Sequence, residues 1–455
     1  MDLWLFIPLL FFFQAIYWYA GKRSTRKISD EKDYFLAGKT VRVFPLMMTF
    51  LATQVGGGVI LGSANETYQF GWPVLLYPLG QALGLIVLGC GVGRRLAEFP
   101  VSTVAELFEV VYGSRLLRKI VSILSIFSLF MILIAQIIAS HKFLVSMGFD
   151  SMVLFILLWA IVILYTAQGG LLAVISTDML QGALFSMVLL SCFGFALFFE
   201  PSISQIKAPQ LMDFANISPK LSGWLLMPLF FVLIGQDMGQ RCFAGGSPKI
   251  VSRASFLAGV CTMIVCIVPV FFGCLAKATN LEVPLGGSVL MTMIAKTTTP
   301  WLTALVGCAV LAAIISTATS LINAISSNLS GDFKFAWLKN QDSLKVAKRI
   351  SGFISIAAIF FAFYFDNVVD VLIQSYELSV SCLFFPVLMA IGKKRGHVLS
   401  AFFSVIFGAA GFFLFRFFPI AFPKEIASIL LSILGYALGK VYVNYRLKRE
   451  ELYER

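Results

Sequence analysis

Apolar runs recur along almost the whole chain, and they are separated by short polar or charged segments. An α-helix needs about 17–25 apolar residues to cross the hydrocarbon core of a membrane. The pattern predicts thirteen spans, at residues 3–20, 41–63, 72–93, 118–141, 151–168, 174–199, 222–242, 253–277, 300–328, 350–365, 371–391, 398–418 and 426–443. We therefore expect an all-α polytopic membrane protein, with one integral domain over residues 1–455.

Two of these spans are interrupted by residues that disfavour a helix. Residues 53–58, Thr-Gln-Val-Gly-Gly-Gly, lie near the middle of the second span, and each glycine weakens a helix by about 1 kcal/mol relative to alanine. The seventh span contains Pro228 and then a polar, glycine-containing segment at 235–241. Broken helices at corresponding places are typical of inverted repeats that surround a site in mid-membrane.

The positions of the breaks predict a 5+5 organisation with helices added at both ends. The expected parts are an additional helix at 3–20, five-span units at 41–199 and 222–391, two additional helices at 398–443 and a cytoplasmic tail at 444–455.

A polar stripe runs along the predicted span at 300–328. Ser316, Ser320, Asn323, Ser327 and Ser330 follow the spacing that places side chains on one face of a helix. An unsatisfied polar group costs several kcal/mol in lipid, so this face is expected to contact protein or water.

Composition supports the membrane class and excludes others. The chain is 59% hydrophobic and 13% charged, whereas soluble domains are roughly 45–50% apolar and about 25% charged. The net charge of +12 does not indicate a surface that binds nucleic acid, because most of the 35 Lys and Arg residues fall in alternate loops. That distribution predicts an outside N-terminus and an inside C-terminus. The basic residues near the first span follow it, so we interpret that span as a helix rather than a signal peptide.

The sequence carries few of the groups that enzymes and metal centres need. The eight cysteines lie in or beside apolar runs without a CxxC pair, and there are only two histidines. No phosphate-binding glycine loop, Ser-His-Asp set or HExxH motif occurs in a sequence context in which it could act, so an enzyme is not expected.

The first break and the polar stripe together suggest a sodium site. Sodium is a hard cation that takes about five or six oxygens, and these can be neutral carbonyls freed where a helix breaks. The break frees carbonyls near Ala52 and Val55, and Ser316 and Thr317 can add two hydroxyls. Alternatively, these hydroxyls bond their own helix or join helices together.

Two acids and four amides lie within apolar spans. Asp178 could form a second cation site, carry a proton, pair with an arginine or simply favour a helix N-terminus. Asp237 could receive a cationic group of a solute or pair with Arg241 four residues later. The amides can hydrogen-bond a polar solute or join helices, and they are Gln54, Gln81, Gln136 and Gln236.

Several short motifs, in order, resemble those of the sodium:solute symporter family. They are YFLAGK at 34–39, TVAE at 103–106, Tyr165 with GGL at 169–171, TDMLQ at 177–181, QRCFA at 240–244, AAIIST at 312–317 with Ser320 and Asn323, and SGD at 330–332. The resemblance implies a LeuT-like inverted-repeat fold.

The resemblance also implies roles for particular residues. It implies that sodium is held by the carbonyls of Ala52, Val55 and Ala313 and the hydroxyls of Ser316 and Thr317. It associates Asp178 with a second sodium or with coupling. For the solute it implies contacts from the broken helices and their neighbours, which here offer Gln54, Gln81, Gln136, Gln236 and Asp237. Pro78 stands where sugar-transporting relatives carry an acid, so sugar is not favoured.

Together these observations predict a sodium-coupled symporter that imports a small polar organic solute, with an amino acid or similar compound favoured. We expect a multi-pass protein of a bacterial cytoplasmic membrane, with Na⁺ as coupling ion and no nucleic-acid or obligate protein partner. A proton-coupled transporter using Asp178 or Asp237, and a non-transporting sensor or channel, are the alternatives.

Overall fold

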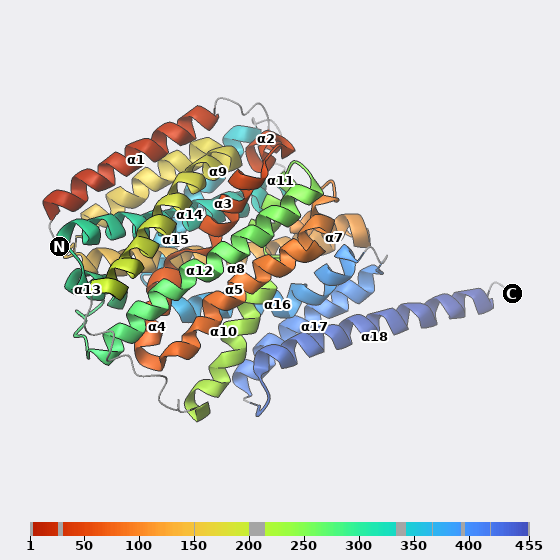
Figure 1. The fold of residues 1–455 in the computed structure, drawn as a ribbon. Helices are drawn as coiled ribbons and strands as arrows, with labels where there is room; N and C mark the ends of the chain where they lie inside the picture. Colours follow the sequence, from red (N-terminus) through yellow and green to blue (C-terminus); the bar gives the residue numbers. More distant parts are fainter. Residues whose placement is uncertain are drawn as a thin grey trace.

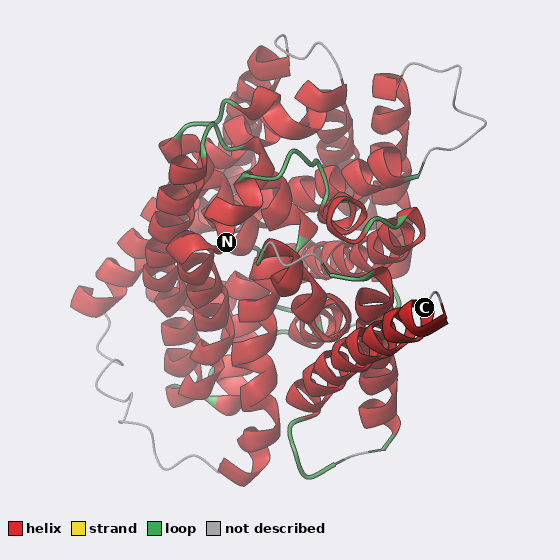
Figure 2. Ribbon diagram, turned by 90° about the vertical axis from the view of Figure 1, so that its right-hand side faces the viewer, coloured by secondary structure: helices red, strands yellow, loops and turns green. Residues whose placement is uncertain are grey.

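The computed structural model describes residues 3–25, 31–149, 151–199, 214–333, 343–365, 367–392, 396–418 and 420–453. Regular structure in these ranges is helical, as Figure 2 shows, apart from one isolated bridge between Val41 and Gly245. The predicted all-α class is confirmed.

The longer helices follow the apolar runs and the shorter ones lie between them or at breaks. In chain order they are α1 (Leu3–Thr25), α2 (Glu31–Leu36), η1 (Ala37–Lys39), α3 (Val43–Gln54), η2 (Gly58–Gly62), α4 (Ser63–Phe70), η3 (Trp72–Leu75), α5 (Leu76–Val87), η4 (Leu88–Val92), α6 (Gly93–Ala97), α7 (Val104–Tyr112), α8 (Arg115–Ser146), α9 (Met152–Phe199), α10 (Phe214–Ile234), α11 (Gln236–Ala244), α12 (Pro248–Ala278), α13 (Val289–Thr297), α14 (Pro300–Asp332), α15 (Ser343–Ala362), α16 (Val368–Ile391), α17 (Val398–Phe417) and α18 (Lys424–Tyr453).

Within the described residues, nine helices are long and apolar enough to cross a membrane, or eleven if each of two bent pairs is one span. The predicted spans at 151–168 and 350–365 are not among the helices counted within the described residues. The first falls in α9, where Phe155–Leu164 is a shorter apolar helix and the backbone turns at Gly170, whose φ is 56°. The second belongs to α15, whose first two turns carry Lys345, Lys348 and Arg349. The number thirteen is therefore not confirmed.

Both predicted breaks are present. The axes of α3 and of the η2–α4 segment differ by 51°, and those of α10 and α11 differ by 41°. The glycines at the first break are required by close packing, because a Cβ on Gly57 would collide with Ala139 and one on Gly58 with Leu372. The glycine-rich segment thus lets α8 and α16 approach the broken helix.

Helix α14 lies in the interior of the bundle, against α8, α9 and α3 (Figure 1). Of its most apolar stretch, 94% is buried. The polar stripe is accordingly enclosed by protein, because Ser316, Ser320, Asn323 and Ser327 are all at most 2% exposed. Helices α17 and α18 pack together at one edge of the bundle.

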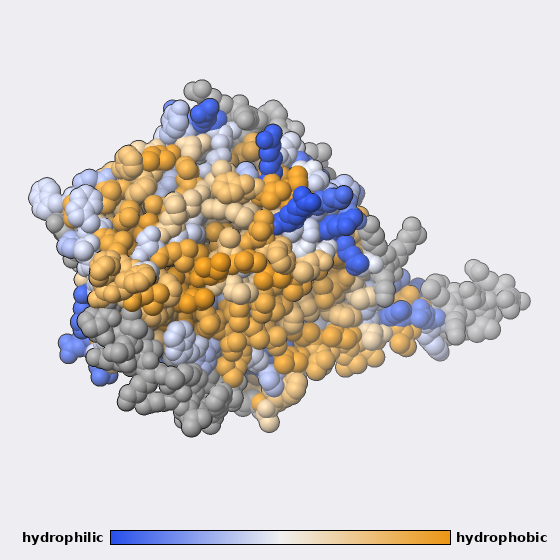
Figure 3. Space-filling view, viewed as in Figure 1, coloured by the Kyte–Doolittle hydropathy of each residue, from blue (hydrophilic) through white to orange (hydrophobic). Residues whose placement is uncertain are grey.

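The outer surface matches a membrane environment. Figure 3 shows a broad hydrophobic face over α12, α5 and α10, with hydrophilic residues gathered toward the two ends. The N-terminus and C-terminus lie at opposite ends of the molecule (Figure 1), and α18 extends beyond the bundle. The orientation in the membrane and the bounds of the two five-span units stay predictions.

Candidate functional site

Oxygen atoms from two helices converge where α3 ends. The Ser316 hydroxyl lies 3.0 Å from the Ala52 carbonyl oxygen and 2.9 Å from that of Ala313. The Thr317 hydroxyl lies 3.2 Å from the carbonyl oxygens of Ala52, Thr53 and Ala313. All five residues are buried. Three carbonyls and two hydroxyls therefore form one neutral cluster between α3 and α14.

This cluster has the chemistry that a hard monovalent cation requires. Oxygen ligands without net charge suit a cation that must bind and leave again. The hydroxyls donate to the carbonyls here, and each hydroxyl oxygen can instead present its lone pairs to an ion when its proton turns away. We call the five residues Ala52, Thr53, Ala313, Ser316 and Thr317 the oxygen cluster.

The predicted ligand Val55 is placed differently from the other predicted ligands. It is buried beyond the last residue of α3, and its N–H donates to the Leu51 carbonyl at 2.9 Å. Among the described residues, no hydrogen bond links its carbonyl to Ser316 or Thr317. The Thr53 carbonyl, which the sequence did not suggest, makes that contact instead.

A buried charged layer lies beside the oxygen cluster. The Arg241 guanidinium reaches Asp178 Oδ2 at 3.4 Å, the Thr49 hydroxyl at 2.9 Å and the Ser320 hydroxyl at 2.6 Å. Thr49 also donates to Asp178 Oδ2 at 2.5 Å. Both charged side chains are completely buried. Of the alternatives for Asp178, the structure shows the arginine pair, and Asp178 lies eight residues beyond the turn at Gly170, past the first turn of that part of α9.

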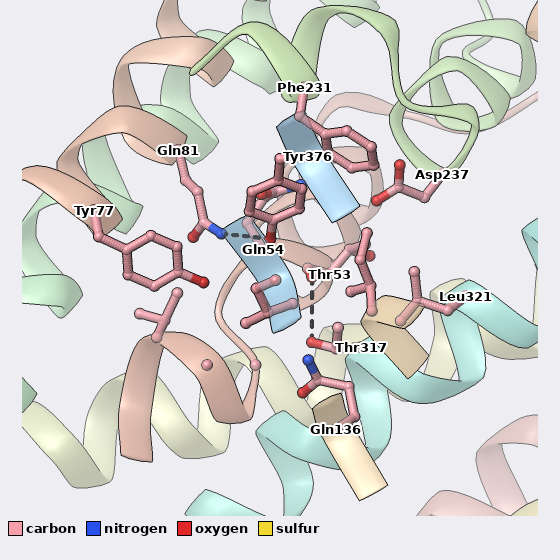
Figure 4. A pocket seen from close by; sticks show the side chains of 15 residues that line it. Thr53, Gln54, Tyr77, Gln81, Gln136, Phe231, Asp237, Thr317, Leu321 and Tyr376 are labelled. Atoms are coloured by element: carbon pink, nitrogen blue, oxygen red, sulfur yellow. Dashed lines mark hydrogen bonds between the residues drawn. The ribbon is translucent and has the colours of Figure 1, made fainter. Parts of the chain in front are cut away.

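Asp237 does not pair with Arg241 through its carboxylate. The guanidinium donates instead to the backbone carbonyl of Asp237, at 2.8 Å. Asp237 is 3% exposed, and its Oδ1 has no hydrogen-bond partner among the described residues. Figure 4 shows the carboxylate turned toward the rings of Phe231 and Tyr376.

A small central cavity joins these groups. Its volume is about 20 Å³, which is room for roughly one water molecule. It is lined by Thr53, Gln54, Gly56, Gly58, Val59, Tyr77, Gln81, Ile132, Gln136, Phe231, Asp237, Thr317, Leu321, Leu372 and Tyr376. Thr53 and Thr317 belong both to the oxygen cluster and to the cavity wall (Figure 4).

Aromatic rings form one wall of the cavity. The Phe231 and Tyr376 rings lie 4.6 Å apart between centroids, with an angle of 33° between their planes. Gln81 Nε2 donates to the Tyr376 hydroxyl at 3.3 Å, and Gln81 Oε1 has no partner among the described residues. The cavity therefore offers ring faces, one carboxylate and, among the described residues, an amide oxygen without a partner.

Three of the four predicted amides line this cavity and one does not. Gln54, Gln81 and Gln136 are in the wall, although Gln136 Oε1 already accepts a hydrogen bond from the Gly57 N–H at 2.8 Å. Gln236 lies outside it. Its Oε1 accepts from the Val104 N–H at 2.7 Å, so this amide joins the second break to the start of α7.

Residues 34–408 match the sequence profile of the sodium:solute symporter family. The chain belongs to that family. The resemblance found in the motifs is thereby confirmed.

Relatives within the family are symporters and transporters of different solutes. The chain is 21% identical over 487 residues to the sodium/pantothenate symporter of Haemophilus influenzae, covering 99% of both proteins. It is 25% identical over 268 residues to the high-affinity choline transporter 1 of Drosophila melanogaster, which covers 57% of this chain and 43% of that transporter.

The fold is similar to that of solved transporters. A Na⁺-coupled sialic acid symporter in a substrate-bound outward-open state has a TM-score of 0.78 and 20% identity, covering 96% of this chain and 98% of the other. That comparison supports the LeuT-like fold of the family.

Sequence reasoning missed the aromatic wall of the cavity. Phe231 precedes the break at Gly235 by one helical turn, so its position relative to the break was an available signal. Tyr376 lies inside α16 between Ser375 and Glu377, so this polar stretch within an apolar span was an available signal as well. Among 45 Phe and 13 Tyr residues, composition alone could not identify either.

Proposed function

We propose that this chain is a sodium-coupled symporter for a small organic solute that carries a cationic group. The buried Asp237 carboxylate in the cavity is the observation on which the solute class rests. A buried carboxylate oxygen is costly when it lacks a hydrogen-bond partner, as Asp237 Oδ1 does among the described residues, and the nearby guanidinium of Arg241 is engaged with Asp178. A cationic group of the solute would supply the missing charge.

The aromatic wall supports the same class of solute. Ring faces attract organic cations and also cover their apolar groups. Phe231 and Tyr376 present such faces beside Asp237. The choline transporter among the relatives carries a solute of this kind, and an amino acid with a free ammonium group would also fit the charge.

Sodium coupling is supported by the two residues that the oxygen cluster and the cavity share. An ion held by the hydroxyls of α14 and the carbonyls of α3 would fix Thr53 and Thr317 relative to each other. Because the same residues border the cavity, the ion would stabilise the arrangement that binds the solute. This is a coupling of two binding free energies through shared side chains.

The cavity of about 20 Å³ must enlarge before it accepts an organic solute. The path along the polar stripe of α14 toward the α7 end is also closed. There, Gln240 Nε2 donates to Asn323 Oδ1 at 3.0 Å and to the Phe35 carbonyl at 2.8 Å. Separation of α11 from α14 and α2 at these contacts would open a path to that end, which we expect to be cytoplasmic.

The proposal is tested by uptake into proteoliposomes that hold the full chain. We expect labelled quaternary amines or amino acids to accumulate under an inward sodium gradient and not under a pH gradient alone. Accumulation driven by pH alone would favour the alternative in which Asp237 carries a proton. A thermal-shift screen of amino acids, quaternary amines, carboxylates and vitamins, with and without sodium, identifies the solute to label.

Asp237→Asn tests the solute class. A hydrogen bond to a charged group is worth about 1.5–3 kcal/mol, so the KM for a cationic solute should rise by about 10-fold to 150-fold. Glu282→Gln, which changes an exposed acid, is the matched control. An unchanged KM in Asp237→Asn would show that this carboxylate does not bind the solute.

A further inference from the structure

A second group of aromatic and acidic side chains lies at the end of the molecule opposite α7. Glu66 and Phe70 come from α4, Lys220 and Trp224 from α10, and Asn367 directly precedes α16. We call Glu66, Phe70, Trp224 and Asn367 the rim cage, and Lys220 lies against it. Helices α4 and α10 belong to the two broken spans and lie near the lower edge of Figure 1.

The rim cage already holds a cation. The Lys220 ammonium lies 4.2 Å from the centroid of the Phe70 ring and 5.8 Å from that of Trp224. The two rings meet at 64° with centroids 5.8 Å apart, so they form two walls around the ammonium. The Glu66 carboxylate faces the same ammonium, and Asn367 Nδ2 donates to its Oε1 at 3.3 Å.

Lys220 fills this cage loosely. Its ammonium is 3.9 Å from Glu66 Oε2, which is longer than a hydrogen bond, and its side chain is 39% exposed. Glu66 Oε2 is buried and has no hydrogen-bond partner among the described residues. Of the other charged groups that act on Glu66, Asp370 strengthens the attraction for a cation and Lys142 weakens it. The cage thus keeps a buried carboxylate oxygen whose charge a better-fitting cation could contact.

The rim cage is aligned with the central cavity along the same helices. On α10, Trp224 precedes the cavity residue Phe231 by seven residues, or about 10 Å along the helix axis. On the first broken span, Glu66 follows the cavity residue Val59 by seven residues, again about 10 Å. Asn367 precedes the cavity residue Leu372 on α16.

The two places also share their chemistry. Asp237 lies beside Phe231 and Tyr376 in the cavity, and Glu66 faces the ammonium that lies over the Phe70 and Trp224 rings in the cage. Each pairs one buried carboxylate oxygen that lacks a hydrogen-bond partner among the described residues with two aromatic rings. A cation that suits one place suits the other.

We propose that the rim cage is a second binding site, for an organic ammonium group that displaces Lys220. An ammonium from solution would lie between the Phe70 and Trp224 rings and contact Glu66 Oε2, while the Lys220 side chain moves into water. That the transported solute binds here before it reaches the central cavity rests on the proposed function. That an organic ammonium group binds in the rim cage does not rest on the proposed function.

The test measures binding of tetramethylammonium chloride by calorimetry to the full chain in detergent, without sodium. All variants carry Asp237→Asn, so that the central carboxylate does not contribute. A tethered ammonium competes with an effective concentration in the millimolar range. Replacing it by Lys220→Met should therefore tighten tetramethylammonium binding by at least about tenfold, whereas Lys220→Arg should not.

A further change locates the binding. Adding Trp224→Leu to Lys220→Met should remove the gain, because one ring wall is lost. Lys220→Gln also removes the tethered charge, and it serves if Lys220→Met does not fold. An affinity that stays the same when the lysine is replaced by either uncharged residue would overturn the proposal. A gain that survives both Trp224→Leu and Glu66→Gln would overturn it as well. A failure here leaves sodium-driven uptake unaffected, and a failure of sodium-driven uptake leaves this binding measurable.

Discussion

The two broken spans are interrupted by opposite kinds of residue. At the first break, between α3 and η2, the chain uses glycines and leaves carbonyl oxygens for the hydroxyls of α14. At the second break, Gly235 is followed by Asp237 and Arg241, which are both buried. One break is neutral and the other is charged.

This difference suggests how one membrane site can distinguish two ligands. A neutral set of oxygens binds a small cation without trapping it, whereas a buried carboxylate prefers a ligand that brings a counter-charge. The two breaks meet at the cavity, where Thr53 and Thr317 represent the neutral break and Asp237 the charged one. We propose that the neutral break binds the sodium and the charged break binds the solute.

The largest effect is expected where the charged break is left with one unpaired charge. Arg241→Met would leave Asp178 buried without its cation, and losing one partner of a buried pair costs about 3–5 kcal/mol. We expect a large fall in the thermal midpoint of the purified protein. Adding Asp178→Asn should recover most of the loss. A single variant as stable as wild type would show that the pair does not hold α11 to α9.

The next effect concerns the neutral break. Ser316→Ala and Thr317→Ala each remove a hydroxyl from the oxygen cluster, and a contact to a charged ligand is worth about 1.5–3 kcal/mol. Sodium-stimulated uptake should be lost, or should need at least about tenfold more sodium, while membrane insertion stays normal.

The matched control for the hydroxyl is Thr317→Ser, which keeps the oxygen. It should retain sodium-stimulated uptake, whereas Thr317→Val should not. Wild-type sodium dependence in both alanine variants would contradict the assignment of the ion to the neutral break.

The sequence was informative for the neutral break and less so for the charged one. Three glycines in an apolar run predict a helix break, and hydroxyls spaced on one helical face predict a buried polar stripe. Both are local patterns, and both features are present in the fold. The partner of Arg241 is not local. Spacing on the helix favoured Asp237 at four residues, but the guanidinium reaches across to Asp178 on α9 because tertiary packing brings those helices together.

The same limit applies to the solute cavity. The amides of Gln54, Gln81 and Gln136 were identifiable because amides are rare in apolar spans, yet Gln236 faces α7 instead. Which way an amide on a broken helix turns depends on the neighbour it meets. That information lies in the packing of distant segments and not in the local pattern.

A smaller effect tests whether the neutral break needs its glycines for packing. A Cβ on Gly57 would collide with Ala139, and overpacking a tight contact costs about 1–3 kcal/mol. Gly57→Ala should therefore lower the thermal midpoint although alanine favours a helix. Gly194→Ala is the control, because a Cβ there meets nothing within 4 Å and should stabilise by up to about 1 kcal/mol. If both variants were equally stabilised, the break would not depend on close approach.

The smallest effect is expected from the ion pair of Glu109 and Arg118, which water can screen. It is the reference against which the buried pair of Arg241 and Asp178 is compared. Glu109 on α7 contacts Arg118 at 2.8 Å and is 29% exposed. The hydrogen bond from Arg118 holds the pKa of Glu109 below its usual range. The folded state then gains stability above the unfolded pKa of about 4.3, and loses it as pH falls through the lowered folded value.

Glu109→Gln should therefore lower stability by less than about 1 kcal/mol at neutral pH, and less in high salt. The difference from wild type should shrink as pH falls below about 4, since both proteins are then uncharged at residue 109. Thermal midpoints measured from pH 7 to pH 3 check this. A loss as large as that of Arg241→Met would mean that burial does not separate the two pairs, because an exposed contact would then stabilise the fold as strongly as the charged break.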